Sequence, residues 1–152
     1  MKNIFSDNFL WVLGQSLCET ALSNNTAYPA SGSFIDVADY TAVHVFVHLG
    51  TIDTDTPAFT LKQTDSASGT LDTIDSTNCK KTIASTDDGQ CLYFYLDPQT
   101  LADDHHFITT YVSGVSGTDY ADIYYLLGPA RHCPVTQTTT VLPTDNVLEK
   151  AG

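Results

Sequence analysis

The chain has 152 residues, of which 42% are hydrophobic and 11% aromatic, so it can bury the core of one folded domain and is too apolar to be disordered. Its formal net charge of -12 would repel the phosphates of nucleic acids and of anionic membranes, which excludes both as expected partners. No apolar run approaches the roughly 20 residues of a membrane span, and the N-terminus lacks the pattern of a secretory signal, so we expect a protein that is not exported.

The amino-acid usage favours strands and turns over helices. Asp outnumbers Glu by 16 to 2, and threonine occurs 22 times. Asp is typical of turns and Thr of pleated strands, and both are weak helix formers. The composition therefore predicts an all-β protein.

Residues 1–32 differ from the rest of the chain and are predicted to form an N-terminal arm. An apolar patch, Phe9 to Leu13, is followed by a link rich in Ser and Asn. Such a patch suits an arm that packs on its own sheet or on a neighbouring subunit. The alternative interpretation is that the patch is simply the first strand of the domain.

Residues 33–128 have the regular pattern of a β-sandwich domain. Around residue 45 the side chains alternate with a period of two, with Val43, Val45, Val47 and Leu49 on one face and Ala42, His44, Phe46 and His48 on the other. Because the second face also carries Phe46, we expect this strand to be covered on both sides.

Further strands are predicted at 58–63, 70–74, 80–85, 91–96, 107–113 and 120–127. The turn residues at 86–89 and 113–117 predict hairpins, and Asp97 followed by Pro98 predicts one helical turn with Asp97 as its N-cap. Seven or eight short strands with almost no helix predict a β-sandwich, of which the jelly-roll-like form is favoured. Residues 129–152 contain three prolines and a TQTTT run, and are predicted to form an extended C-terminal tail.

The four cysteines, Cys18, Cys79, Cys91 and Cys133, have no metal-binding spacing. If 86–89 is a hairpin turn, Cys79 and Cys91 are offset by several residues and cannot pair. We therefore predict free and mostly buried thiols, as in reduced cytosol.

No metal site is predicted. His44 and His48 are about 13 Å apart on a strand, too far to hold one ion. Two other groups of possible ligands have a simpler explanation as solvated turns: Asp103 to His106, and the pair of loops containing Asp53 with Asp55 and Asp87 with Asp88.

No catalytic residue and no cofactor is predicted either. The chain lacks a GxSxG motif, the neighbouring His132 and Cys133 are not aligned by adjacency alone, and sixteen Asp residues give neighbouring carboxylates by chance. We therefore expect the protein not to be an enzyme.

The tyrosines indicate a binding surface. Tyr93 and Tyr95 share one strand face, as do Tyr120 and Tyr124. Tyrosine suits a surface that is partly buried against a protein or a sugar. The other interpretation, which is favoured, is that these rings pack inside the sandwich, with the hydroxyl groups at its edge.

Several segments taken together resemble the capsid decoration (auxiliary head) proteins of tailed bacteriophages. These segments are FIDVADYTAVHVFVHLG, PAFTLKQTDSASGT, DHHFITTYVSG and YYLLG, which cover much of residues 34–128. The likeness lies in strand order and texture. It implies a jelly-roll-like subunit, commonly trimeric, that binds the outer surface of an icosahedral capsid and clamps neighbouring major capsid proteins without catalysis.

The resemblance also implies a location on the capsid exterior of the virion, after assembly in the host cytoplasm. By analogy, the expected contact residues are Phe9, Leu10, Trp11, Val12, Leu13, Thr136, Thr138, Thr140, Val141 and Leu142. Two alternatives stay open: a carbohydrate-binding module of a tail or adhesion protein that uses Tyr side chains and Ca²⁺-ordered loops, and an adaptor at a head-tail or tail-tube junction.

Overall fold

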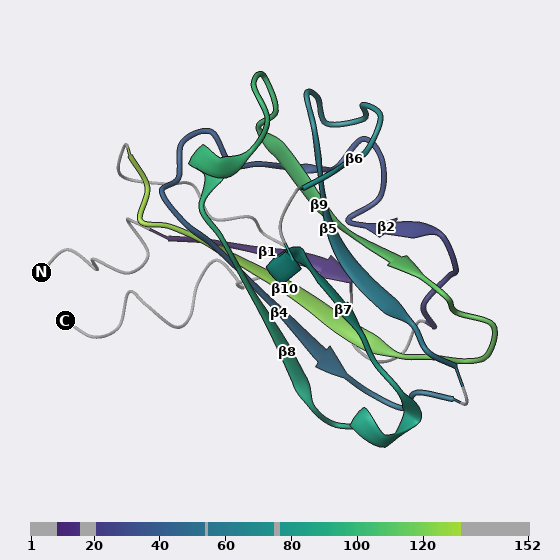
Figure 1. Cartoon of the computed structure of the whole chain (residues 1–152). Coiled ribbons are helices and arrows are strands. Elements are labelled where there is room, and N and C mark those ends of the chain that lie inside the picture. Colours follow the sequence, from purple (N-terminus) through teal and green to yellow (C-terminus); the bar gives the residue numbers. More distant parts are fainter. Residues whose placement is uncertain (1–8, 16–20, 54, 75–76, 132–152) are drawn as a thin grey trace, which may run out of the picture.

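The computed structural model describes residues 9–15, 21–53, 55–74 and 77–131 (Figure 1). Within these ranges nearly all regular structure is β-strand, which confirms the all-β prediction. The helical segments described are single 3-10 turns: η1 (Thr77–Cys79), η2 (Ser85–Asp87) and η3 (Pro98–Thr100). None of them has the length and apolar character that a bilayer-crossing helix needs.

The described strands are β1 (Leu10–Gln15), β2 (Thr26–Tyr28), β3 (Ile35–Asp36), β4 (Val43–Leu49), β5 (Ala58–Thr64), β6 (Asp72–Thr73), β7 (Lys80–Thr82), β8 (Cys91–Leu96), β9 (Phe107–Ser113) and β10 (Ala121–Leu127). The longer ones lie where the alternating patterns predict them. The predicted strands at 70–74 and 80–85 shorten to β6 and β7.

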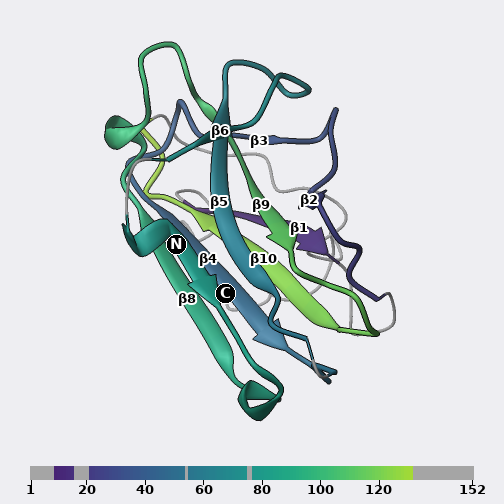
Figure 2. The same ribbon diagram turned by 45° about the vertical axis from the view of Figure 1, so that its right-hand side comes forward.

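Two antiparallel sheets stack into a sandwich (Figures 1 and 2). Sheet A has the order β1-β10-β4-β8. Sheet B has the order β2-β9-β5-β6, with β3 paired to β9 and β7 paired to β5. The predicted β-sandwich is confirmed.

The core lies between the sheets. Val43, Val45, Val47 and Leu49 of β4 are fully buried, and Phe59 of β5 is fully buried opposite them in sheet B. Burial on this scale is the main stabilising term of such a fold.

The prediction that β4 is covered on both sides is wrong for its outer face in the described part of the chain. His44 and Phe46 are half-buried and His48 is exposed in the described part of the chain. Phe46 instead packs beside Tyr93 of the neighbouring strand, which gives an aromatic side chain partial cover without another layer.

The two predicted hairpins are wrong. β7 pairs with β5 in sheet B and β8 with β4 in sheet A, so residues 83–90 cross from one sheet to the other. Residues 114–120 cross in the same way between β9 and β10. Gly89 and Gly114 do have the positive φ expected of turn residues, at 72° and 80°. A turn sequence fixes a local reversal of the chain, but not the sheet that the next strand joins.

Because the predicted hairpin at 86–89 does not form, the register inferred from it between Cys79 and Cys91 is wrong. Cys79 is buried as predicted, whereas Cys91 is exposed.

The predicted boundaries of the sandwich at 33 and 128 are too narrow. β1 pairs with β10 and β2 with β9, so parts of the predicted N-terminal arm are strands of the two sheets. At the other end, Ala130 forms a β-bridge with Tyr40. The apolar patch therefore belongs to a strand, as the alternative interpretation had it. The patch is too short for its sequence alone to distinguish a strand from an arm.

The predicted helical turn is confirmed in detail. The Asp97 carboxylate accepts a hydrogen bond of 2.9 Å from the backbone N–H of Gln99, and Pro98 occupies the first position of η3.

Candidate functional site

The outer face of sheet A carries an aromatic patch built by strand register. Residues directly opposite each other in antiparallel strands share a face. Reading across β10, β4 and β8 gives three rows: Leu126–His44–Tyr95, Tyr124–Phe46–Tyr93 and Asp122–His48–Cys91. We call His44, Phe46, Tyr93, Tyr95, Tyr124 and Leu126 the tyrosine face.

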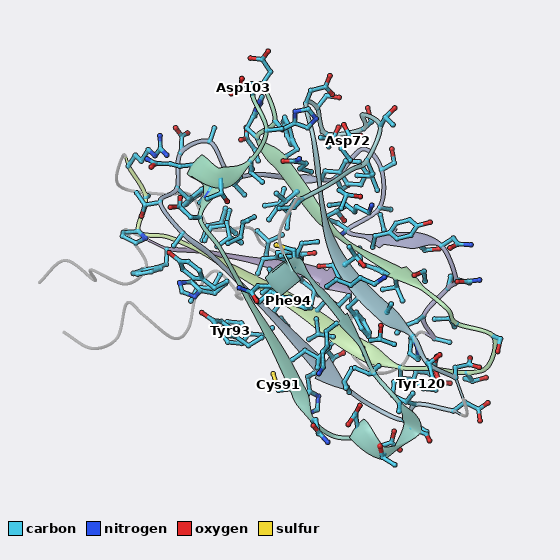
Figure 3. The ribbon with its side chains drawn as sticks, viewed as in Figure 1. Asp72, Cys91, Tyr93, Phe94, Asp103 and Tyr120 are labelled. Carbon is cyan, nitrogen blue, oxygen red and sulfur yellow. The ribbon has the colours of Figure 1, made fainter. Side chains whose placement is uncertain are left out.

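Tyr93 and Tyr95 are the most solvent-accessible part of this face. They are 54% and 52% exposed and are the exposed large hydrophobic residues in the described part of the chain. Figure 3 shows Tyr93 on the side of β8 that faces away from sheet B, whereas Phe94, 3% exposed, points into the sandwich. Alternation along β8 thus puts both tyrosines on the outer surface.

The rings are held in place by their neighbours. His44 Nδ1 lies 2.7 Å from the Tyr93 hydroxyl, and the His44 ring is stacked on that of Tyr93 with centroids 6.0 Å apart. The His44 ring also meets Tyr95 edge-on at 5.5 Å, and Phe46 packs against Tyr93 at 5.4 Å. Rings ordered in this way lose less side-chain entropy when a partner binds.

None of the six residues of the tyrosine face is an Asp, Glu, Lys or Arg, although the whole chain has a formal net charge of -12. Lys62, Lys80 and Lys81 lie on β5 and β7 of sheet B. The nearest charged group in the three rows is Asp122, whose Oδ2 is 3.9 Å from His48 Nδ1. The face is therefore an uncharged patch on an acidic molecule.

The structure places the predicted tyrosines differently from one another. Tyr93 and Tyr95 share one strand face as predicted, but that face is exposed, contrary to the favoured interpretation that these rings pack inside the sandwich. Tyr124 joins them through its register with Phe46. Tyr120 precedes β10, and its backbone N–H donates to Thr51 O. The tyrosine that packs inside the sandwich is Tyr125, which is fully buried.

The predicted contact residues of the N-terminal patch belong partly to the core. Leu10 and Val12 pack against it, while Phe9 and Leu13 are half-buried. Trp11 pairs with Leu126 through its backbone, and its side chain lies outside what the structure describes. The predicted contact residues of the tail, Thr136, Thr138, Thr140, Val141 and Leu142, also lie outside the described residues.

Sequence reasoning missed His44 and Phe46 as members of the tyrosine face. The two-residue alternation along β4 already placed both residues on the face opposite the buried valines. The sequence alone does not predict that β8 is the neighbour of β4 in sheet A.

The metal candidates do not form a site. Within the described ranges, no three His, Cys, Asp or Glu side chains are placed to hold a metal ion. In the Asp103 to His106 turn, both ring nitrogens of His105 have protein partners: Nδ1 lies 3.0 Å from Asp103 O and Nε2 lies 3.1 Å from Asp72 Oδ2. Figure 3 shows Asp72 and Asp103 at the same end of the molecule.

These contacts predict a pH effect on stability. The hydrogen bond to Asp103 O, and next the one to Asp72, raise the pKa of His105. A raised histidine pKa adds stability below the unfolded-state pKa of about 6.5, and this is lost as the pH rises through the folded value. We expect Asp72→Asn to lower the melting temperature at about pH 5.5 and to leave it unchanged at about pH 8.5.

Differential scanning fluorimetry at the two pH values checks this prediction. Asp104→Asn is a matched control, because Asp104 is a neighbouring exposed acid at a positive φ of 65° that Asn tolerates. An equal fall in the melting temperature of Asp72→Asn at both pH values would contradict the role assigned to His105.

Comparison of the chain with known protein families, with curated proteins and with solved structures found no match. The fold and the tyrosine face define the protein at the level of class, as an antiparallel β-sandwich with an exposed aromatic patch on one sheet.

Proposed function

We propose that this protein is a non-enzymatic structural component of a phage virion. In this role it binds the outer surface of an icosahedral capsid and clamps neighbouring major capsid proteins. The tyrosine face is the attachment surface. The observation that carries the proposal is the pair of half-exposed tyrosines, Tyr93 and Tyr95, held beside His44 on the outside of sheet A.

The chemistry of the face suits a protein partner. Tyrosine brings a large contact area with few rotatable bonds and a hydroxyl that forms hydrogen bonds at the rim, and it is enriched among the residues that dominate binding energy. The rest of the molecule is strongly acidic, which keeps free subunits apart in solution. An uncharged patch on such a body favours one docking orientation.

Capsid stabilisation follows from mass action. A ligand that binds only the assembled lattice makes disassembly less favourable by an amount that grows with ligand concentration. No bond is made or broken in this role, and no cofactor takes part.

Three finer features of the proposal rest on the sequence resemblance: a jelly-roll-like topology, a trimer, and a position on the capsid exterior after assembly in the host cytoplasm. Segments outside the described residues, including 136–142, are proposed to add contacts between subunits or with the coat.

Sedimentation with purified capsids of tailed phages tests the proposal. The protein is expected to pellet with capsids, to saturate at a fixed ratio to coat subunits, and to raise the temperature at which the shells open. If it stays in the supernatant with every capsid tested, the proposal fails.

A carbohydrate-binding role is the second candidate. Tyr93 and Tyr95 lie two residues apart on one exposed strand face, and neighbouring aromatic rings of this kind can stack on the apolar faces of sugar rings. A glycan array distinguishes the roles, since glycan binding that Tyr93→Ala abolishes, without capsid binding, would favour this candidate.

A further inference from the structure

At one end of the sandwich, three of the crossing segments meet: the described residues of 50–57, which are 50–53 and 55–57, then 83–90 and 114–120. We call this region the connection end. Backbone hydrogen bonds join its parts, from Gly50 N–H to Tyr120 O at 2.8 Å and from Tyr120 N–H to Thr51 O at 2.9 Å. Tyr120 marks this end in Figure 3, remote from Asp72 and Asp103.

Three carboxylates link these segments by accepting backbone hydrogen bonds. Asp55 accepts from the N–H groups of Ser116 and Gly117 and from the Ser116 hydroxyl. Asp88 Oδ1 accepts from Ile52 N–H at 2.8 Å. Asp119 Oδ1 accepts from Asp53 N–H at 2.8 Å. Each acid thus ties its own segment to a different one.

Asp119 differs from the other two acids. Its side chain is fully buried, and its Oδ2 atom has no hydrogen-bond partner. A buried ionised carboxylate with an unsatisfied oxygen is costly. The titratable groups that act on it are Asp53 and Asp55 from segment 50–57 and Asp88 from segment 83–90, and all of them are acids.

Burial, and then the negative charges of Asp55, Asp53 and Asp88, raise the pKa of Asp119. The pKa of Asp55 moves the other way, because the Ser116 hydroxyl and the backbone N–H groups of Ser116 and Gly117 stabilise its ionised form. Two acids at one end of the molecule therefore favour opposite protonation states.

A proton suits Asp119 better than a metal ion does. No three His, Cys, Asp or Glu side chains of the described chain are placed to hold a metal, so the described carboxylates give a cation too few ligands at Oδ2. A single proton neutralises Asp119 without needing further ligands.

We propose that the connection end is a pH-sensitive latch, which is closed when Asp119 is protonated and Asp55 is ionised, and which loosens when Asp119 loses its proton. This inference concerns regulation of the fold and does not depend on the proposed attachment function.

The signs of the two effects follow from linkage. Because the folded-state pKa of Asp119 is raised, its contribution to stability is complete below the unfolded value of about 3.9 and is lost as the pH rises through the folded value. The contribution of Asp55 is present above its unfolded pKa and is lost as the pH falls through its lowered folded value. The latch is therefore tightest between the two folded values, where both contributions are complete near the unfolded pKa of about 3.9.

Thermal unfolding of the full chain between about pH 4 and pH 8 tests the latch. Asp119→Asn, an uncharged isostere, is expected to be more stable than the wild type at about pH 8 and to lose the part of the fall in melting temperature with rising pH that Asp119 causes, while the part due to His105 remains. Asp55→Asn is expected to be less stable than the wild type throughout this range, because the contribution of Asp55 is lost only below its unfolded pKa of about 3.9. Asp103→Asn, an exposed acid at the opposite end, is the control.

Amide hydrogen exchange of the wild type provides a test that needs no variant to fold. After correction for intrinsic rates, the protection of the Asp53 amide is expected to fall by up to about tenfold per pH unit between the open-state pKa of about 3.9 and the raised folded pKa of Asp119, and to level off above the folded value, while opening stays local. A pH-independent protection factor would overturn the proposal, as would an Asp119→Asn protein with the pH profile of the wild type. It would also be overturned if Ca²⁺ raised the melting temperature only when Asp119 is present, because a cation would then be the counter-charge.

Discussion

Replacing Tyr93 and Tyr95 together by alanine is expected to weaken capsid binding by at least about 100-fold. Truncation of a central aromatic residue in an interface commonly costs about 2 kcal/mol or more, and each 1.4 kcal/mol is tenfold in affinity. Both rings are about half exposed and are positioned by His44, so their contact area is available to a partner without rearrangement. Co-sedimentation titrations with capsids measure the loss.

Two controls make this result specific. Tyr111→Ala removes a half-buried tyrosine from β9 of sheet B and is expected to leave capsid binding within about threefold of the wild type if the variant remains folded. A Tyr93→Phe and Tyr95→Phe double variant keeps the ring area and is expected to bind more tightly than the alanine pair. Wild-type affinity in a folded alanine pair would show that the tyrosine face is not the attachment surface.

Tyr125→Phe is expected to destabilise the fold by about 2 kcal/mol. The hydroxyl of Tyr125 donates to Tyr28 O at 2.5 Å and shares a hydrogen bond of 2.5 Å with Thr110 Oγ1. Since β10 lies in sheet A and its two partners lie in sheet B, this hydroxyl joins the sheets across the core. Its removal deprives two polar groups of a buried partner, at about 1 to 3 kcal/mol for a lost buried hydrogen bond.

Urea unfolding measures this effect, with a lower midpoint and an unchanged slope expected. Tyr95→Phe is the matched control, because it removes the hydroxyl of a half-exposed tyrosine and is expected to change stability by less than about 0.5 kcal/mol. Equal stability of Tyr125→Phe and the wild type would contradict the role given to the buried hydroxyl. Burial raises the pKa of Tyr125, so the same hydrogen bonds persist over the physiological pH range.

Features set by local sequence could be predicted. The two-residue alternation from Val43 to Leu49 identified β4 and its buried face, because strand geometry alone fixes which side chains share a face. The Asp97 cap could be predicted for the same reason, since it depends on residues within one turn. Neither required knowledge of the rest of the chain.

Features set by distant partners could not be predicted. The turn at 86–89 looks the same whether it closes a hairpin or leads from sheet B to sheet A, and only the pairing of β8 with β4 decides between them. The apolar patch of β1 was open between arm and strand because its partner, β10, lies more than a hundred residues away.

The candidate site could be predicted only in part, for the same reason. The spacing of Tyr93 and Tyr95 placed both on one strand face, but whether that face points outward depends on the position of β8 in sheet A. Asp119 gave no signal at all, because an Asp in a turn is normally solvated, and its burial follows from the meeting of separate segments.

Electron cryomicroscopy of purified phage capsids saturated with the protein tests the central claim most directly. We expect density for the sandwich on the outer surface of the shell, with Tyr93 and Tyr95 of sheet A in contact with coat subunits. A shell without added density, or a bound sandwich whose sheet A points to solvent, would contradict it.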